Sequence, residues 1–148
     1  MDLGLGSKRV LVTGASTGIG AEIARHFLLE QAKVSIVARG LGQLALTDKK
    51  LSEEFGEKNV YAEICDCTDI QSLTTLSKKI EAKWGGIDIV VANVGDGRSV
   101  ADALPDADQW EDTWGKNFET ALLTARSFLP MLRASKGCLL FVSSIAAK

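Results

Sequence analysis

The sequence has few of the residues that mark secreted, fibrous or membrane-spanning chains. Only 2 of its 148 residues are proline and no repeat period is present, which argues against a collagen-like or solenoid architecture. No apolar run approaches the length of a membrane span. Residues 1–6 lack the basic region and the apolar stretch of a signal peptide. We therefore expect a cytoplasmic protein without a membrane partner.

A large excess of charge of either sign is also absent. The chain has 17 basic and 19 acidic residues, and a net charge of −2 gives no overall basic footprint for binding nucleic acid. Hydrophobic residues make up 46%, which is too many for an intrinsically disordered chain. Length and composition together predict one globular domain over residues 1–148.

Cysteine and histidine are scarce. Cys65, Cys67 and Cys138 are odd in number and lack CxxC spacing, so a disulfide framework is not expected. We interpret all three as small, buried apolar side chains. The single histidine, His26, cannot anchor a His-rich metal site, and no metal is expected.

Apolar runs and helical spacings alternate along the chain. Strands are expected at residues 8–13, 33–38, 59–65, 87–92 and 138–142, and helices at 19–30, 41–55, 68–84 and 106–133. Two of these helices open on the spacing of a capping box, in which Thr68 is paired with Gln71 and Asp106 with Gln109.

The predicted strands are apolar runs without clean alternation, which is typical of strands covered by helices on both faces. Right-handed crossovers between such strands produce a doubly wound parallel α/β sheet. The most economical strand order is 3-2-1-4-5. Ligands are then expected beyond the carboxyl ends of the strands, at the switch point between strands 1 and 4.

A glycine-rich segment lies between the first predicted strand and the first predicted helix. Gly14 allows a tight turn, Gly18 lets the backbone approach a pyrophosphate, and Gly20 allows the helix to pack closely on the strand. The start of the helix presents free N–H groups and the positive end of its dipole to an anion. In this strand–loop–helix context, the glycines predict a phosphate loop for a dinucleotide.

The end of the second predicted strand bears on the choice of dinucleotide. An NAD site usually has an acidic residue there for the ribose 2′-hydroxyl, whereas this chain has Ala38 and Arg39. A guanidinium suits a 2′-phosphate, and Ser16 and Thr17 could donate further hydrogen bonds. We therefore predict NADP(H) rather than NAD(H). The alternative is that Arg39 is only a solvent-exposed cation at the start of a helix.

The segment Thr13-Gly14-Ala15-Ser16-Thr17-Gly18-Ile19-Gly20 resembles the TGxxxGxG signature of the short-chain dehydrogenase/reductase family. Asp66 stands where the family has an Asp that contacts adenine. Asn93 and Gly95 remain from the family's NNAG motif, although Ala92 and Val94 depart from it. The resemblance implies a Rossmann-like fold in which these residues, with Arg39, bind the cofactor.

Two further positions match the family's catalytic motifs in order. Asn117 lies at the position of the catalytic-helix Asn, and Ser144 aligns with the catalytic Ser. The resemblance implies reversible hydride transfer between NADP(H) and a small carbonyl or alcohol substrate. In the family, the Ser binds the substrate oxygen and the Asn holds a water that links the catalytic Lys to solvent. Residues 96–99 follow the fourth predicted strand and could border the substrate pocket.

The family's acid/base motif, Tyr-x-x-x-Lys, is missing from the sequence. The chain stops at Lys148, and its single tyrosine, Tyr61, falls in the third predicted strand. We therefore expect an incomplete, N-terminal dinucleotide-binding portion that lacks the family's final strands and is inactive by itself, or nearly so.

Two other functions remain open. The chain could be a non-catalytic NADP(H)-binding sensor or interaction module. It could also be a flavodoxin-like or receiver domain with the same strand order, although a receiver would need clustered acids where Thr13 and Gly14 stand.

Large apolar residues recur along the last predicted helix. Trp110, Trp114, Phe118 and Leu122 are spaced four residues apart. Core packing is one interpretation. The family uses this helix as a dimer interface, so the resemblance also implies a homo-oligomer, and an apolar helix covered on two sides would satisfy both.

Overall fold

The described strands form one parallel sheet. The computed structural model describes residues 3–97 and 104–144. The strands are β1 (Arg9–Thr13), β2 (Lys33–Ala38), β3 (Val60–Ile64), β4 (Ile89–Ala92) and β5 (Cys138–Phe141). Their order is β3-β2-β1-β4-β5 and each neighbouring pair is parallel. This confirms the predicted doubly wound, Rossmann-like topology.

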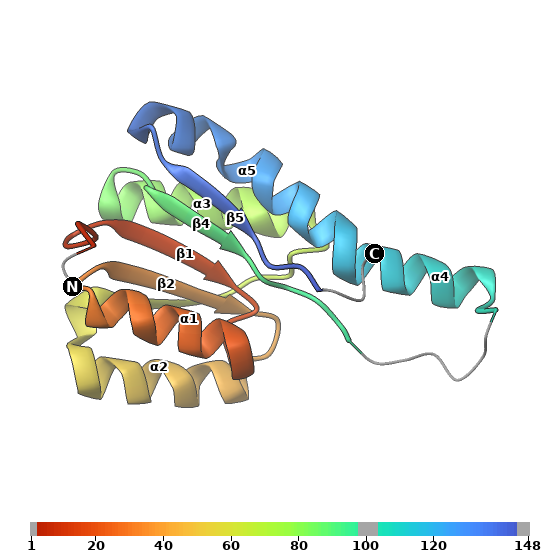
Figure 1. The fold of residues 1–148 in the computed structure, drawn as a ribbon, viewed down its shortest axis with the longest axis horizontal. Coiled ribbons are helices and arrows are strands. Elements are labelled where there is room, and N and C mark those ends of the chain that lie inside the picture. Colours follow the sequence, from red (N-terminus) through yellow and green to blue (C-terminus); the bar gives the residue numbers. More distant parts are fainter. Residues whose placement is uncertain (1–2, 98–103, 145–148) are drawn as a thin grey trace.

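Helices cover both faces of the sheet (Figure 1). They are α1 (Gly18–Leu29), α2 (Leu41–Phe55), α3 (Ile70–Trp84), α4 (Ala107–Trp114) and α5 (Thr120–Ser135), with a 3-10 turn at Glu57–Asn59. Helices α1 and α2 lie on one face and α3 and α5 on the other, while α4 projects beyond the sheet. None of the helices in the described part of the chain is both long enough and apolar enough to cross a bilayer.

The side chains of β1 alternate between two separate hydrophobic cores, one on each face of the sheet. Val10 and Val12 belong to the core under α1 and α2, whereas Leu11 belongs to the core under α3 and α5. All three residues are fully buried. Successive side chains of a strand point to opposite faces, so one short apolar run supplies both layers.

The start of α3 differs from the predicted capping box. The N-cap is Asp69, whose carboxylate accepts hydrogen bonds from the backbone N–H groups of Gln71 and Ser72 at 3.0 and 3.1 Å. The Thr68 hydroxyl instead donates to Asp66 Oδ1 at 2.7 Å. The prediction was wrong because an aspartate one residue later caps the helix. At α4, the predicted capping box is confirmed, with Asp106 and Gln109 bonded reciprocally.

The single helix expected over 106–133 is interrupted. A π-helical turn at Gly115–Glu119 separates α4 from α5. Within this turn, the Asn117 side-chain amide donates to the Thr113 carbonyl at 2.9 Å. An amide side chain that competes for a helix carbonyl favours such a local departure from regular α-helical bonding.

The prediction that all three cysteines are buried is only partly confirmed. Cys65 and Cys67 are buried and all three thiols are free, but Cys138 is exposed. Cys138 lies on β5, which is an edge strand of the described sheet. Phe141, on the same strand, is 56% exposed.

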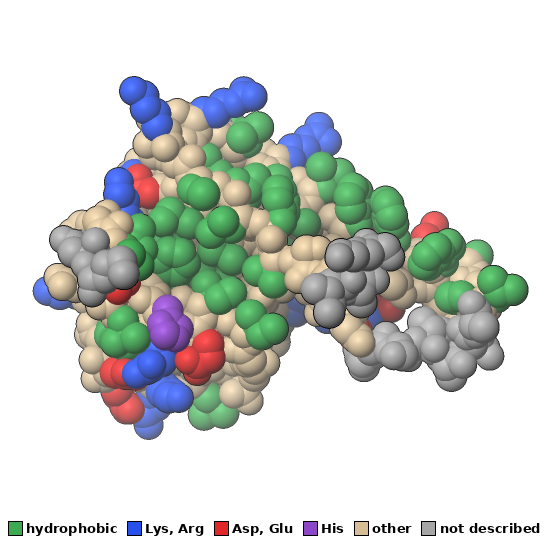
Figure 2. All heavy atoms as spheres, viewed as in Figure 1, with side chains coloured by type: hydrophobic (Ala, Val, Ile, Leu, Met, Phe, Trp, Pro, Cys, Tyr) green, Lys and Arg blue, Asp and Glu red, His purple; other side chains and the backbone are tan. Residues whose placement is uncertain are grey.

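The apolar residues along the last predicted helix are not core residues of the described chain. Trp110, Trp114, Phe118 and Leu122 are each about half exposed or more, which overturns the core-packing interpretation. Trp114 and Phe118 contact each other, with ring centroids 4.4 Å apart. Figure 2 shows hydrophobic side chains gathered over β4 and β5 and along α5 towards α4.

Candidate cofactor-binding site

A cavity of about 440 Å³ lies at the carboxyl ends of four strands. Residues that follow β1, β2, β3 and β4 line it, together with two residues of the π-helical turn and the start of α5. They are Gly14, Ser16, Ala38, Arg39, Gly40, Gln43, Cys65, Asp66, Cys67, Thr68, Val94, Gly95, Asp96, Lys116 and Thr120. The volume is that of a small-molecule site, and parallel strands converge at such an edge.

The loop after β1 is shaped by close contacts that only glycine permits. Gly14 has φ +63°, and a Cβ there would lie 3.2 Å from Val94 Cα. At Gly20, on the first turn of α1, a Cβ would overlap the Gly14 carbonyl oxygen. At Gly18, with φ +58°, nothing lies within 4 Å of a built Cβ. The loop therefore turns tightly, packs against β4, and leaves space beside Gly18.

Asn93, the first residue after β4, braces this loop. Its side-chain amide donates to the carbonyls of Thr13 and Gly14 at 3.1 and 3.2 Å. The backbone N–H of Asn93 donates to the Thr13 hydroxyl at 3.0 Å, and that hydroxyl donates to the Val91 carbonyl. Thr13 is buried, and these hydrogen bonds attach the loop to the carboxyl end of the sheet.

Helix α1 begins beside the loop with unused donors. Thr17 is the N-cap, in extended conformation, and its side chain makes no capping hydrogen bond. The first N–H groups of a helix have no partner within the helix, and the helix dipole favours an anion near them. Ser16 lines the cavity next to this helix start. The arrangement is that of a phosphate-binding loop.

Arg39 and Asp66 stand on neighbouring strand ends in the cavity lining. Arg39 is exposed at the end of β2. Asp66 Oδ1 accepts hydrogen bonds from the Thr68 backbone N–H and hydroxyl at 2.9 and 2.7 Å. The Thr68 N–H lowers the pKa of Asp66, and the Thr68 hydroxyl and the charge of Arg39 add to that effect. Asp66 is therefore an anion at neutral pH.

Two thiols flank Asp66 on the cavity wall. Cys65 and Cys67 are 1% and 3% exposed. Contact with the Cys65 thiol, together with burial, raises the pKa of Cys67 above its ordinary value. Cys67 is therefore a neutral, weakly polar contact for whatever lies in the cavity.

Asn117 joins the π-helical turn to the loop after β4. Its Oδ1 accepts a hydrogen bond from the Asp96 backbone N–H at 2.9 Å, and its Nδ2 donates to Thr113. A Cβ on Gly95 would lie 3.1 Å from Asn117 Oδ1, so glycine allows this approach. Lys116 Nζ lies 3.8 Å from Asp96 Oδ2 and 2.5 Å from Asp112 Oδ2.

Ser144 follows β5 on the same edge of the sheet as the cavity. It is exposed and lies three residues beyond Phe141, the last residue of β5. Phe141 pairs with Ala92, and the Val142 N–H donates to the Ala92 carbonyl at 3.0 Å. Ser144 therefore belongs to the carboxyl-end edge that also carries Asn93 and the cavity.

Most of the predicted site residues are brought together, although not all of them line the cavity. Gly14, Ser16, Arg39, Asp66 and Gly95 line it. Thr13 and Asn93 brace the loop, while the segment 17–20 forms the N-cap and first turn of α1. Of the candidate substrate-pocket residues 96–99, Asp96 lines the cavity, whereas Arg98 and Ser99 lie outside the described residues.

Sequence reasoning missed several residues of the site. Gln43 and Lys116 line the cavity, and Thr47 bonds to the glycine loop. For Thr47 there was a usable signal, because a hydroxyl stands between Leu44 and Leu51 on the buried face of its helix. Lys116 depends on the π-helical turn, for which the sequence has no simple pattern.

Tyr61 does not belong to the site. It lies on β3, where its hydroxyl donates to Glu63 Oε2 at 2.8 Å. Burial, together with this hydrogen bond, raises its pKa to about 12. The chain's single tyrosine is therefore a protonated structural side chain at neutral pH.

The residues around the cavity fit a dinucleotide cofactor. The glycine loop and the start of α1 offer backbone donors for phosphate groups, and Arg39 adds a cation at the end of β2. Asp66 offers a carboxylate beside the weakly polar Cys67. Backbone N–H donors, a guanidinium and a carboxylate thus line the same cavity.

The strand order and the glycine loop at the carboxyl ends of the strands define a nucleotide-binding domain of the Rossmann type. The family model described as short chain dehydrogenase matches residues 8–148. The chain belongs to this family.

Similar proteins agree with that assignment. An uncharacterized oxidoreductase of Staphylococcus saprophyticus is 34% identical over 143 residues, which are 96% of this chain and 61% of that protein. L-sorbose reductase from Gluconobacter frateurii, solved with NADPH and L-sorbose, superposes with a TM-score of 0.91 at 30% identity. The match covers 99% of this chain and 56% of the reductase.

A short chain oxidoreductase from Pseudomonas aeruginosa, solved with NADPH bound and containing an atypical catalytic center, is also similar. It superposes with a TM-score of 0.90 at 27% identity, covering 95% of this chain and 55% of that protein. The chain thus spans between half and two thirds of the length of these three relatives.

Proposed function

We propose that the protein is an NADP(H)-dependent oxidoreductase in which residues 1–148 form the cofactor-binding portion. The reaction is hydride transfer between NADP(H) and a carbonyl or alcohol substrate. The observation that carries the proposal is the cavity shared by the glycine loop, Arg39 and Asp66. Two of the similar structures contain NADPH, which supports the same cofactor here.

The bound nicotinamide supplies the hydride, and the chain positions the cofactor. The segment 14–20 holds the diphosphate through backbone N–H groups and the start of α1. Asp66 accepts a hydrogen bond from the adenine, next to Cys67. Asn93 keeps the loop against the sheet and so keeps its donors in place.

Arg39 determines the preference of the site for NADP(H) over NAD(H). It is an exposed guanidinium at the end of β2, where the cavity begins. No carboxylate stands beside it at position 38 or 40 to bind the two ribose hydroxyls of NAD(H). A guanidinium binds a 2′-phosphate through paired, charge-assisted hydrogen bonds.

Ser144 and Asn117 serve the reacting end of the site. Ser144 donates a hydrogen bond to the substrate oxygen from the end of β5. Asn117 holds the loop after β4 through the Asp96 N–H and anchors a water in the proton path. We assign no proton transfer to Tyr61, because its pKa of about 12 and its bond to Glu63 keep it protonated. The acid/base pair then belongs to a part of the protein outside residues 1–148.

A second copy of the protein covers the apolar face of α4 and the start of α5. Trp110, Trp114, Phe118 and Leu122 present large side chains that are about half exposed or more. Burial of such a face stabilises an oligomer by removing apolar surface from water. The oligomeric state proposed for the protein is therefore a homo-oligomer that associates through this face.

Parallel titrations of the purified protein with NADPH and NADH test the proposal. We expect NADPH to bind at least tenfold more tightly than NADH, and Arg39→Ala to remove most of the difference. Arg133→Ala, in the last turn of α5, is the control, because it removes an exposed guanidinium that does not line the cavity. Equal or tighter binding of NADH would reject the cofactor assignment. Residues 1–148 should bind NADPH without oxidising it under either function, so the absence of NADPH oxidation across a panel of carbonyl substrates would favour the non-catalytic binding module only when it is measured on the whole protein.

A further inference from the structure

The glycine loop is attached to the rest of the domain from two sides. On the side of β4, Asn93 donates to the carbonyls of Thr13 and Gly14. On the side of α2, the Thr47 hydroxyl donates to the Ser16 carbonyl at 2.7 Å. Between these two attachments, the Ala15 N–H donates to the Val37 carbonyl at 3.1 Å. Thr47 thus connects α2 to the middle of the loop through a hydrogen bond.

The direction of a loop carbonyl matters in an anion site. Backbone N–H groups attract a phosphate, whereas a carbonyl oxygen turned towards it repels it. The Thr47 hydroxyl donates to the Ser16 carbonyl, and Ser16 itself lines the cavity. Loss of the hydroxyl leaves this carbonyl without the donor from α2 that fixes its direction.

Helix α2 presents Thr47 in a fixed position. Leu44 and Leu51, on the same face of the helix, are each 2% exposed and pack into the core. Thr47 lies between them, three residues after one and four before the other, so its hydroxyl points towards the protein. A hydroxyl on an otherwise apolar face needs a partner, and the Ser16 carbonyl is that partner.

We propose that Thr47 is a positioning residue that holds the glycine loop in the conformation that binds the cofactor diphosphate. The inference rests on the proposed NADP(H) site. It adds a residue on α2, outside the glycine signature, on which cofactor affinity depends. Thr47 acts through the Ser16 carbonyl and does not itself touch the cofactor.

The test compares Thr47→Val, which removes the hydroxyl while nearly keeping the shape, with Thr47→Ser, which retains it. Thr75→Val on α3 is the matched control, because the Thr75 hydroxyl also donates to a backbone carbonyl, that of Gln71 at 2.9 Å. Dissociation constants are measured for NADPH and for adenosine 2′-monophosphate, which lacks the diphosphate. Thermal melting of each variant checks that it is folded.

We expect Thr47→Val to weaken NADPH binding about threefold to tenfold, the effect of one hydrogen bond, and to leave binding of adenosine 2′-monophosphate unchanged. Thr47→Ser and Thr75→Val should bind both ligands as the wild type does. Equal NADPH affinities of Thr47→Val and Thr47→Ser overturn the inference while the proposed function stands. Equal weakening of both ligands also overturns it, because it indicates displacement of α2. Failure of the wild type to bind NADPH overturns the proposed function and this inference together.

Discussion

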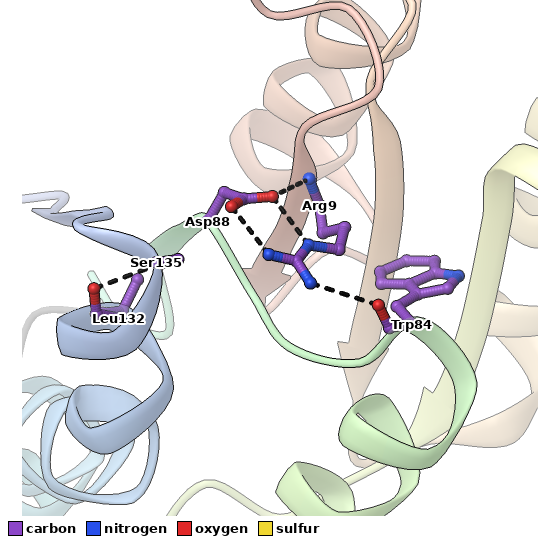
Figure 3. A network of polar contacts seen from close by, with 5 residues as sticks. All are labelled: Arg9, Trp84, Asp88, Leu132 and Ser135. Carbon is purple, nitrogen blue, oxygen red and sulfur yellow. Dashed lines mark hydrogen bonds and ion pairs between the residues drawn. The ribbon is translucent and has the colours of Figure 1, made fainter.

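The Arg9 guanidinium and the Asp88 carboxylate join β1 to the start of β4 at the end of the sheet opposite the cavity (Figure 3). Arg9 Nε and Nη2 donate to Asp88 Oδ2 and Oδ1, each at 2.8 Å. The Arg9 backbone N–H also donates to Oδ2, and Nη1 donates to the Trp84 carbonyl at 3.2 Å. One ion pair therefore ties two strands to the end of α3.

Replacement of Asp88 by Asn should destabilise the domain. Three donors of Arg9 lose a charged acceptor, and the two side chains are only 25% and 15% exposed. We expect the free energy of unfolding, measured with urea, to fall by about 2 kcal/mol. Arg25→Met, which breaks the more exposed Arg25–Glu54 pair, is the control and should cost less. An equal loss of unfolding free energy in both variants would show that the Asp88 network stabilises the domain no more than the exposed Arg25–Glu54 pair does.

The same carboxylate gives the stability a pH dependence. Hydrogen bonds from Arg9 lower the pKa of Asp88 below its ordinary value. A lowered pKa in the folded state contributes stability above the unfolded pKa of about 4, and this stability is lost as the pH falls through the folded pKa. Urea midpoints measured between pH 7 and pH 3 should therefore fall more steeply for the wild type than for Asp88→Asn. If the urea midpoints of both proteins fall equally with pH, the lowered pKa of Asp88 does not contribute to the pH dependence of stability.

Gly20→Ala should damage the glycine loop through packing. A Cβ at this position would overlap the Gly14 carbonyl oxygen, which is backbone and can move only with the loop. We expect a loss of about 1–3 kcal/mol in stability, together with weaker NADPH binding. Gly42→Ala is the contrasting control, because the built Cβ has nothing within 4 Å and the residue lies inside α2. That variant should gain about 0.5–1 kcal/mol in unfolding experiments and bind NADPH normally.

The apolar face of α4 and the π-helical turn should decide the oligomeric state. Trp114 and Phe118, with ring centroids 4.4 Å apart, are 54% and 48% exposed. Replacing both by Gln should shift the purified protein to a smaller species in sedimentation velocity runs. Leu46→Gln, at a 63% exposed position on α2, should leave the sedimentation coefficient unchanged. If the double variant sediments like the wild type, this face is not the interface.

The arrangement of the sheet was predictable because its determinants are local. Lys33–Ala38 and Leu41–Phe55 begin and end at the predicted residues, where apolar runs meet Gly40 and Gly56. The strand order followed from the alternation of strands and helices with right-handed crossovers. The glycine loop was predictable for the same reason, since Gly14, Gly18 and Gly20 stand between a strand and a helix.

Features that depend on contacts distant in the sequence were not predictable. The π-helical turn arises where the Asn117 side chain bonds both to Thr113 and to the Asp96 backbone 21 residues away. Helical periodicity describes one helix at a time, so it places Trp114 and Phe118 on a face without telling whether anything covers that face. The N-cap of α3 was misplaced by one residue for a local reason, because the neighbouring Asp69 caps the helix while the Thr68 hydroxyl bonds to Asp66.

Hydrogen–deuterium exchange of the purified protein with and without NADPH tests most directly that the cofactor lies in this cavity. Exchange should slow on addition of NADPH in the segments 14–20, 38–43 and 65–68, which surround the cavity. It should stay unchanged in β3 around Tyr61, which lies outside the cavity lining. A second, apolar groove lies beside α1 and is lined by Leu3, Leu5 and residues of α1 from Gly18 onwards. Unchanged exchange in the segments 38–43 and 65–68 with NADPH bound, or slowing confined to residues 3–5 and 22–30 of that groove, would contradict the account.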